Sequence, residues 1–203
     1  MRTATSRLEA FSDGVFAIAA TLLILNVQES GSPLGSALLR IWPSYAAYAV
    51  SFLTIGIIWI NHHTVMAQIE KVDRLFLVLN VIFLMFIAFI PFPMRLLAVH
   101  INAEGAEAAA VSYGVVLTLT AIMFNAVWRY AAAGRRLLRE DADRRVVQGI
   151  GRSYLPGPFM YFAATLVALV NPRVSAGLYA AIAVFYIVES SLFGGRDTSP
   201  EQL

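Results

Sequence analysis

The chain has 203 residues, of which 59% are hydrophobic and only 14% are charged. A soluble domain averages about 45–50% apolar and about 25% charged residues, so this composition indicates an integral membrane protein. The absence of cysteine excludes disulfides, thiolate metal sites and cysteine nucleophiles, and a net charge of only +2 argues against a nucleic-acid partner.

Apolar runs divide the chain into six predicted transmembrane helices, and no polar stretch between them is long enough to form a second core. We therefore expect an all-α integral membrane protein with a single six-helix transmembrane domain over residues 1–203. The six segments are Leu8–Val27, Leu38–Asn61, Leu75–Val99, Ala108–Ala131, Leu155–Val170 and Val174–Phe193.

Turn and capping residues separate these segments. Asp73 is placed to cap the third helix, and Pro91 and Pro93 are expected to kink or end it. Asn171-Pro172 predicts a tight turn between the fifth and sixth helices. Two further sets mark the first turn and the irregular start of the short fifth helix: Gly31, Ser32, Pro33 and Gly35, and Pro156 and Pro158.

Basic residues are distributed unequally between the two sides of the predicted bundle. Twelve fall on the side that carries the chain ends and three on the other, which predicts that both termini are cytoplasmic. The stretch Arg129–Arg152 is expected to be a solvated cytoplasmic connection that can contact anionic lipid. The twelve are Arg2, Arg7, Lys71, Arg74, Arg129, Arg135, Arg136, Arg139, Arg144, Arg145, Arg152 and Arg196, and the three are Arg40, Arg95 and Arg173.

The first helix carries polar residues that it cannot keep out of the membrane. Its uninterrupted apolar part, Gly14–Val27, covers roughly 21 Å, which is short of a hydrocarbon core of about 30 Å. To span, the helix must begin near Leu8, and this brings Ser12 and Asp13 toward the membrane. An ionisable residue there is costly, so Asp13 marks a candidate functional site.

Steps of three and four residues divide the first helix into stripes. Arg7 and Asp13 lie about 240° apart around the helix, so each is expected to find partners on another helix or another subunit. We predict that Asp13 is charged and buried, with His62 as its nearest partner. The alternative is an ordinary lipid-facing or core helix whose polar end lies in the interface. One stripe contains Arg7, Phe11, Gly14, Ile18, Leu22 and Leu25, with Thr21 beside it, and a second contains Asp13, Ala17, Ala20 and Ile24.

The second helix ends in Trp59-Ile60-Asn61-His62-His63, which is expected at the depth of Ser12 and Asp13. His62 can donate to a carboxylate or a serine oxygen, or respond to pH. His62 and His63 point about 100° apart on a helix, which argues against a shared metal ion. Asn80, inside an apolar segment, is expected to bond across helices.

Enzymatic signatures are missing. The sequence contains no Gly-x-Ser-x-Gly elbow, no His-Glu-x-x-His helix and no phosphate-binding loop. Glu189 is the only carboxylate besides Asp13 well within a predicted span, so a paired-aspartate protease is not indicated. We expect a protein that is not an enzyme.

The polar residues of the first three helices resemble those of a known family. Arg7-x-x-x-Phe11-Ser12-Asp13, followed by Gly-Val-Phe-Ala-Ile-Ala-Ala-Thr-Leu-Leu, resembles the first helix of the bacterial relatives of the endolysosomal potassium channel, the transmembrane protein 175 family. Trp59-x-x-His62 and Asn80 followed by Pro91-Phe92-Pro93 are similar as well. The resemblance extends over the whole six-helix length.

This resemblance implies a homotetrameric channel for potassium and other monovalent cations in a bacterial plasma membrane. The first helix of each subunit would line the pore, without a re-entrant selectivity-filter loop, and the Thr-Val-Gly-Tyr-Gly string of ordinary potassium channels is indeed absent. No cofactor is implied, and no metal beyond the permeating potassium. At the position of Ala17, animal members of the family carry a serine, next to the narrowest part of the pore.

The resemblance also implies roles for individual residues. Ile18 would form the hydrophobic constriction, with Leu22 and Leu25 toward the outer mouth, and Thr21 would favour potassium. The signature residues would brace the pore helices against the second and third helices. These bracing residues are Arg7, Phe11, Ser12 and Asp13 on the first helix, with Trp59, His62 and Asn80 as their partners.

Two other functions remain open at this point. One is a proton-coupled secondary transporter that uses Asp13 and His62 as a relay, although paired broken helices and an inverted repeat are not visible in the sequence. The other is a membrane scaffold that conducts nothing.

Overall fold

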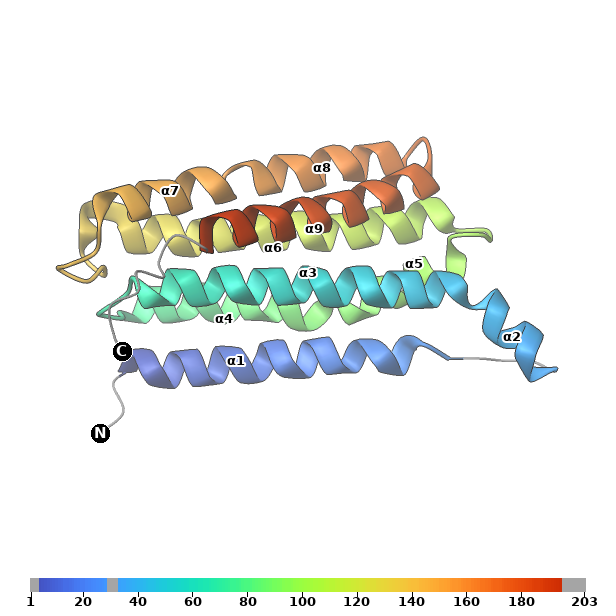
Figure 1. The fold of residues 1–203 in the computed structure, drawn as a ribbon, viewed down its shortest axis with the longest axis horizontal. Coiled ribbons are helices and arrows are strands. Elements are labelled where there is room, and N and C mark those ends of the chain that lie inside the picture. Colours follow the sequence, from blue (N-terminus) through green and yellow to red (C-terminus); the bar gives the residue numbers. More distant parts are fainter. Residues whose placement is uncertain (1–3, 29–32, 195–203) are drawn as a thin grey trace.

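Long helices that run along a common axis make up the computed structural model, which describes residues 4–28 and 33–194 (Figure 1). In these residues the only pairing of the β type is one isolated bridge, between Ile69 and Leu138. The helices are α1 (Ala4–Leu22), η1 (Leu23–Asn26), α2 (Leu34–Arg40), α3 (Trp42–Ala67), α4 (Arg74–Phe89), α5 (Pro91–His100), α6 (Ala106–Ala132), η2 (Ala133–Arg135), α7 (Arg144–Tyr154), α8 (Pro156–Ala168) and α9 (Pro172–Gly194).

Five helical stretches among the described residues are long and apolar enough to cross a membrane: Thr5–Asn26, Trp42–Ala67, Arg74–His100, Ala106–Arg135 and Pro172–Glu189. They correspond to five of the six predicted segments.

The remaining predicted segment, Leu155–Val170, forms α8, which has only 13 residues. Such a helix covers about 20 Å, less than a hydrocarbon core. The amphipathic helix α7 directly precedes α8 and continues its direction along the same side of the bundle (Figure 1).

The predicted cap at Asp73 and the predicted break at Pro91 are confirmed, whereas Gly35, expected in the first turn, lies within α2. Asp73 caps α4 by accepting a hydrogen bond from the Phe76 backbone N–H at 2.8 Å, and its other oxygen accepts one from the Tyr130 hydroxyl at 2.7 Å. These two donors hold the pKa of the Asp73 carboxyl below its usual range. The helix is interrupted at Pro91, where α4 gives way to α5. Of the turn and terminal residues named above, Arg2, Gly31, Ser32 and Arg196 lie outside the described residues.

Helix α6 is central, packing against α4, α5, α8 and α9, whereas α1 packs mainly against α3 and α4. The α6–α9 contact is close because position 114 is glycine, since a Cβ there would overlap the side chains of Tyr179 and Thr165. The Tyr179 hydroxyl instead donates to the Ala110 carbonyl at 3.1 Å. Helix α1 thus lies on α3 and α4, which in turn pack against α5, α6 and α9.

The connection between α6 and α7 is not the freely solvated loop that its charge suggested. Leu137 and Leu138 are buried, and the backbone folds back onto the α3–α4 connection. The Leu137 carbonyl accepts from the Glu70 N–H at 3.0 Å, and the Arg139 N–H donates to the Gln68 carbonyl at 2.9 Å. The expectation failed because two apolar side chains within the basic stretch are buried and dock it.

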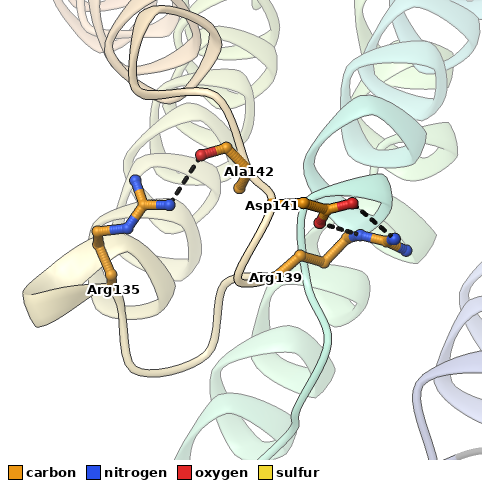
Figure 2. Close-up of polar contacts among 4 residues, drawn as sticks. All are labelled: Arg135, Arg139, Asp141 and Ala142. Atoms are coloured by element: carbon orange, nitrogen blue, oxygen red, sulfur yellow. Dashed lines mark hydrogen bonds and ion pairs between the residues drawn. The ribbon is translucent and has the colours of Figure 1, made fainter.

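Charged side chains lie on the outside of this connection. Arg139 forms an ion pair with Asp141 at 2.9 Å, and Arg135 donates to the Ala142 carbonyl at 2.8 Å (Figure 2). The Arg139 guanidinium holds the pKa of the Asp141 carboxyl below its usual range. Because both partners are exposed, this pair shapes the turn and adds little to stability.

Candidate functional site

Helix α1, which η1 continues directly to Asn26, has two distinct faces. Leu8, Ser12, Phe16, Ala19 and Leu23 follow one another at steps of three and four and are buried toward α3 and α4. The opposite face points away from the rest of the protomer. It carries the predicted stripe, Arg7, Phe11, Gly14, Ile18, Leu22 and Leu25, with Thr21 beside it, and all seven are exposed.

Exposure of apolar residues alone does not single out this face, because other helices also expose large apolar side chains, as a bilayer allows. The exposed side of α1 differs in composition. Ile18 is 61% exposed and Leu25 is 63% exposed, yet the charged Arg7 and the hydroxyl of Thr21 share this side with them, and the exposed Asp13 lies at its edge. Charged groups facing lipid are costly, so this side of α1 is suited to face water or another subunit.

Thr21 lies one turn after Ile18 and is oriented by it. Its hydroxyl donates to the Ile18 carbonyl of the same helix at 2.9 Å. Because the hydroxyl proton is engaged with the backbone, the oxygen lone pairs are left free to accept. A hydroxyl in this state can offer an oxygen ligand to a cation.

A buried polar chain joins α1, α3 and α4. The Asn80 side-chain N–H donates to the Ser12 hydroxyl at 3.1 Å, and its carbonyl oxygen lies 3.0 Å from His62 Nε2. Since a carbonyl only accepts, His62 Nε2 is the donor in this arrangement. Exposure of these three side chains is 2% or less. The predicted cross-helix bonding of Asn80 is confirmed.

Aromatic rings surround the histidine of this chain. The His62 ring stacks on Phe83 with centroids 5.7 Å apart and an 8° interplanar angle, and Phe16 of α1 lies 5.5 Å from it. Phe83 also contacts Phe124 of α6 at 5.7 Å. The ring is thus held in one position, and α1 is fixed in rotation at the level of Ser12.

The prediction that Asp13 is buried beside His62 is wrong. Asp13 is exposed, and its carboxylate accepts a hydrogen bond from Trp59 Nε1 at 2.8 Å. Successive residues on a helix point about 100° apart. Because Ser12 faces α4, Asp13 is turned to the edge of α1 next to α3. Asp13 and His62 therefore bond to different partners, with no direct hydrogen bond to relay a proton between them.

We expect Asp13→Ala and Trp59→Phe to lower the unfolding midpoint of the protein by similar amounts, and the double variant to lose little more. Both single changes remove the same hydrogen bond, whose coupling we place at about 1 kcal/mol. Asp13→Asn, which keeps an acceptor oxygen, should retain part of it. Detergent-induced unfolding of the unmodified protein, the two single variants and the double variant completes this double-mutant cycle. Fully additive losses of stability would show that the two side chains act independently.

Sequence reasoning missed two bonds that hold the two ends of the continuous segment formed by α1 and η1. The Thr5 hydroxyl donates to the Glu70 carbonyl at 3.2 Å at one end. At the other end, Asn26 donates to the Pro91 carbonyl at 3.2 Å, beside the α4–α5 break. The available signal was an asparagine at the end of an apolar run and a proline-interrupted helix. With the contacts of Ser12 and Asp13 between them, this segment is held along its whole length, with the stripe through Ile18 outward.

A sequence model of the family described as endosomal/lysosomal potassium channel TMEM175 matches residues 7–91. A potassium channel of Chamaesiphon minutus is 38% identical over 193 residues, covering 92% of this chain and 95% of that protein. A potassium channel of Streptomyces collinus is 36% identical over 187 residues, covering 90% of this chain and 91% of that protein. The endosomal/lysosomal proton channel TMEM175 of Gallus gallus is 37% identical, but the match covers 64% of this chain and 28% of that protein.

Solved structures agree with this relationship. The crystal structure of a lysosomal potassium-selective channel TMEM175 homolog from Chamaesiphon minutus superposes with a TM-score of 0.85 at 35% identity, covering 93% of this chain and 99% of that one. A variant of the potassium channel MtTMEM175, solved in complex with a nanobody fusion protein, shares the fold, with a TM-score of 0.63 at 18% identity over 97% of this chain and 95% of that one.

Proposed function

Since the chain belongs to the TMEM175 family of potassium channels, we propose that it is a potassium-permeable cation channel whose pore is lined by α1 from four identical subunits. The single observation that carries this proposal is the outward side of α1, where Ile18, Thr21 and Leu25 are exposed beside charged residues. One protomer offers one such side and cannot enclose a pathway alone, whereas copies around a closed symmetry axis can.

In this assembly Ile18 forms the narrowest ring, and Leu22 and Leu25 line the path toward the outer mouth. A ring of apolar side chains can block ions by excluding water. Arg7 and Phe11, exposed on the same side of α1, lie at subunit boundaries, where Arg7 meets a neighbouring chain.

We place both termini on the cytoplasmic side of a bacterial plasma membrane, with α8 as the sixth span extended by the end of α7. The start of α1, the α3–α4 connection and the basic α6–α7 connection are bonded to one another through Thr5, Glu70 and Leu137. They therefore share one end of the bundle (Figure 1). This gathers most of the basic residues on one side, as is typical of cytoplasmic loops.

Replacing Thr21 with valine is expected to lower the potassium-to-sodium permeability ratio toward one while conduction persists. Valine keeps the shape but removes the hydroxyl oxygen that can replace part of the hydration shell of a cation, and potassium releases water more readily than sodium. Thr21→Ser, which keeps the hydroxyl, should retain the preference. Reversal potentials under bi-ionic conditions measure the ratio, and an unchanged ratio in Thr21→Val would place selectivity at another residue.

Two measurements on purified protein test the proposed function. Planar bilayers should show large passive currents, whereas a proton-coupled carrier would give slow flux that depends on the proton gradient and a scaffold would give none. The mass of the detergent-solubilised protein should be four times the 22.2 kDa of the chain, after subtraction of detergent. A stable monomer would rule out the shared pore.

A further inference from the structure

A large cavity lies within the protomer, away from α1. Its volume is about 520 Å³, it is open on one side, and it is lined by residues of α3, α5, α6 and α9 and of the segment after α5. No α1 residue lines it. Trp42 at the start of α3, Asn102 after α5 and Arg173 at the start of α9 all lie at the end of the bundle opposite the basic α6–α7 connection. The volume is within the usual range of small-molecule sites, roughly 300–1,000 Å³.

The inner part of this cavity offers an apolar surface to a ligand. Its walls there include Val50, Leu97 and Ala98. The polar atoms in the depth already have partners within the protein. The hydroxyls of Ser51 and Tyr113 are bonded to each other at 2.8 Å, and the Tyr179 hydroxyl donates to a backbone carbonyl. No buried polar group is left to recognise a polar ligand, so the depth is suited to a hydrocarbon chain.

The rim has the opposite character. The exposed Arg173 lines it beside Asn102 and Trp42, of which Trp42 is 60% exposed. In the part of the chain that the structure describes, the only ion pair is Arg139–Asp141, so the Arg173 guanidinium has no carboxylate partner there. Guanidinium groups bind phosphate oxygens with paired hydrogen bonds, and both tryptophan and arginine act as anchors at the membrane interface.

We propose that this cavity binds one acyl chain of an anionic phospholipid from the leaflet opposite the basic connection, with the phosphate held by Arg173. An apolar cavity with a single unpaired cation at its rim is complementary to a molecule with an apolar chain and an anionic headgroup. Asn102 adds amide hydrogen bonds to the same headgroup. The bound chain contacts α3, α5 and α9 together and joins the start of α3 to the start of α9.

The test uses the full-length protein in phosphatidylcholine vesicles, with phosphatidylglycerol bearing brominated acyl chains as the probe. Bromine quenches tryptophan fluorescence on contact, and the signal of Trp42 is the part that is lost in Trp42→Phe. We expect saturable quenching at several-fold lower mole fractions of brominated phosphatidylglycerol than of brominated phosphatidylcholine. Arg173→Gln should abolish this preference, whereas Arg95→Gln, a matched change on the same side of the predicted bundle but outside the cavity, should leave it intact.

A second variant tests the chain-binding part of the cavity. Gly177 lines it, and a Cβ added there meets no atom within 4 Å, so Gly177→Leu can place its side chain in the open space. This variant should lose the saturable quenching by both lipids. Native mass spectrometry of Arg173→Gln, in which the apolar walls of the cavity are unaltered, gives a second readout. This variant should retain fewer phosphatidylglycerol molecules than the unmodified protein.

Three outcomes would overturn the proposal. Quenching that rises linearly with mole fraction, equally for both lipids, would mean that Trp42 contacts bulk lipid only. Saturable binding of a brominated free fatty acid without binding of phosphatidylglycerol would assign the cavity to fatty acids. A preference that survives in Arg173→Gln by both readouts would place the anionic headgroup elsewhere.

Discussion

The potassium current of Ile18→Asn should exceed that of the unmodified protein several-fold, with weaker discrimination between ions. In the proposed tetramer four Ile18 side chains meet and exclude water, and an amide at each would hold water in the constriction. Ile18 is 61% exposed in the protomer, so the substitution does not bury an unpaired amide within the fold. Single-channel recordings of protein that elutes as the normal assembly measure the effect.

Val184→Asn is the matched control for this prediction. Val184 is exposed on α9, far along the chain from α1, and receives the same change from a β-branched apolar side chain to an amide. Its current should equal that of the unmodified protein. If Ile18→Asn assembles correctly and conducts no more than the control, Ile18 is not the gate.

Asn80→Leu is expected to cost the most stability of the changes considered, about 2–4 kcal/mol. The replacement has a similar volume but leaves both the Ser12 hydroxyl and the His62 N–H buried without their partner. Each unsatisfied group costs about 1–3 kcal/mol, and membrane hydrogen bonds fall at the lower end. Because this chain fixes α1 in rotation, conduction should fall as well.

Unfolding by a denaturing detergent, followed by size-exclusion chromatography, measures this loss. Thr64→Val on α3 is a suitable control, because the Thr64 hydroxyl bonds only to the Ile60 carbonyl of its own helix, and its loss should be small. If Asn80→Leu unfolds at the same detergent concentration as Thr64→Val, the buried polar chain does not brace the pore helix.

Periodicity and capping chemistry made much of the fold predictable. The stripe through Ile18 and Leu25 follows from the 3.6-residue period, and it does form one face of α1. Asp73 caps α4 as predicted, and Asn171, predicted to lie in a turn, accepts from the backbone N–H groups of Arg173 and Val174 at the start of α9. Such bonds can be predicted from the sequence because the acceptor side chain and the donor backbone N–H are only a few residues apart.

The partners of Asp13 were not predictable because they depend on how α1 is rotated against its neighbours. Ser12 and Asp13 are adjacent, and a rotation of about 100° would exchange their environments. The sequence contains both polar residues but not the rotation, which is set by packing of Phe16 and Leu23 into the core. Similarly, Leu138 packs against the α3–α4 connection, which is distant in the sequence. The many charges around Leu138 predicted a solvated loop instead.

The central claim, that the outward side of α1 faces the ion pathway, is tested most directly by thiol modification of a chain that contains no cysteine. Leu25→Cys places one thiol on this side, and Ala19→Cys places one on the buried side of the same helix. A charged methanethiosulfonate reagent added during bilayer recording should reduce the current of Leu25→Cys and leave that of Ala19→Cys unchanged. A Leu25→Cys protein that is fully modified by mass spectrometry, yet conducts as before, would contradict the claim.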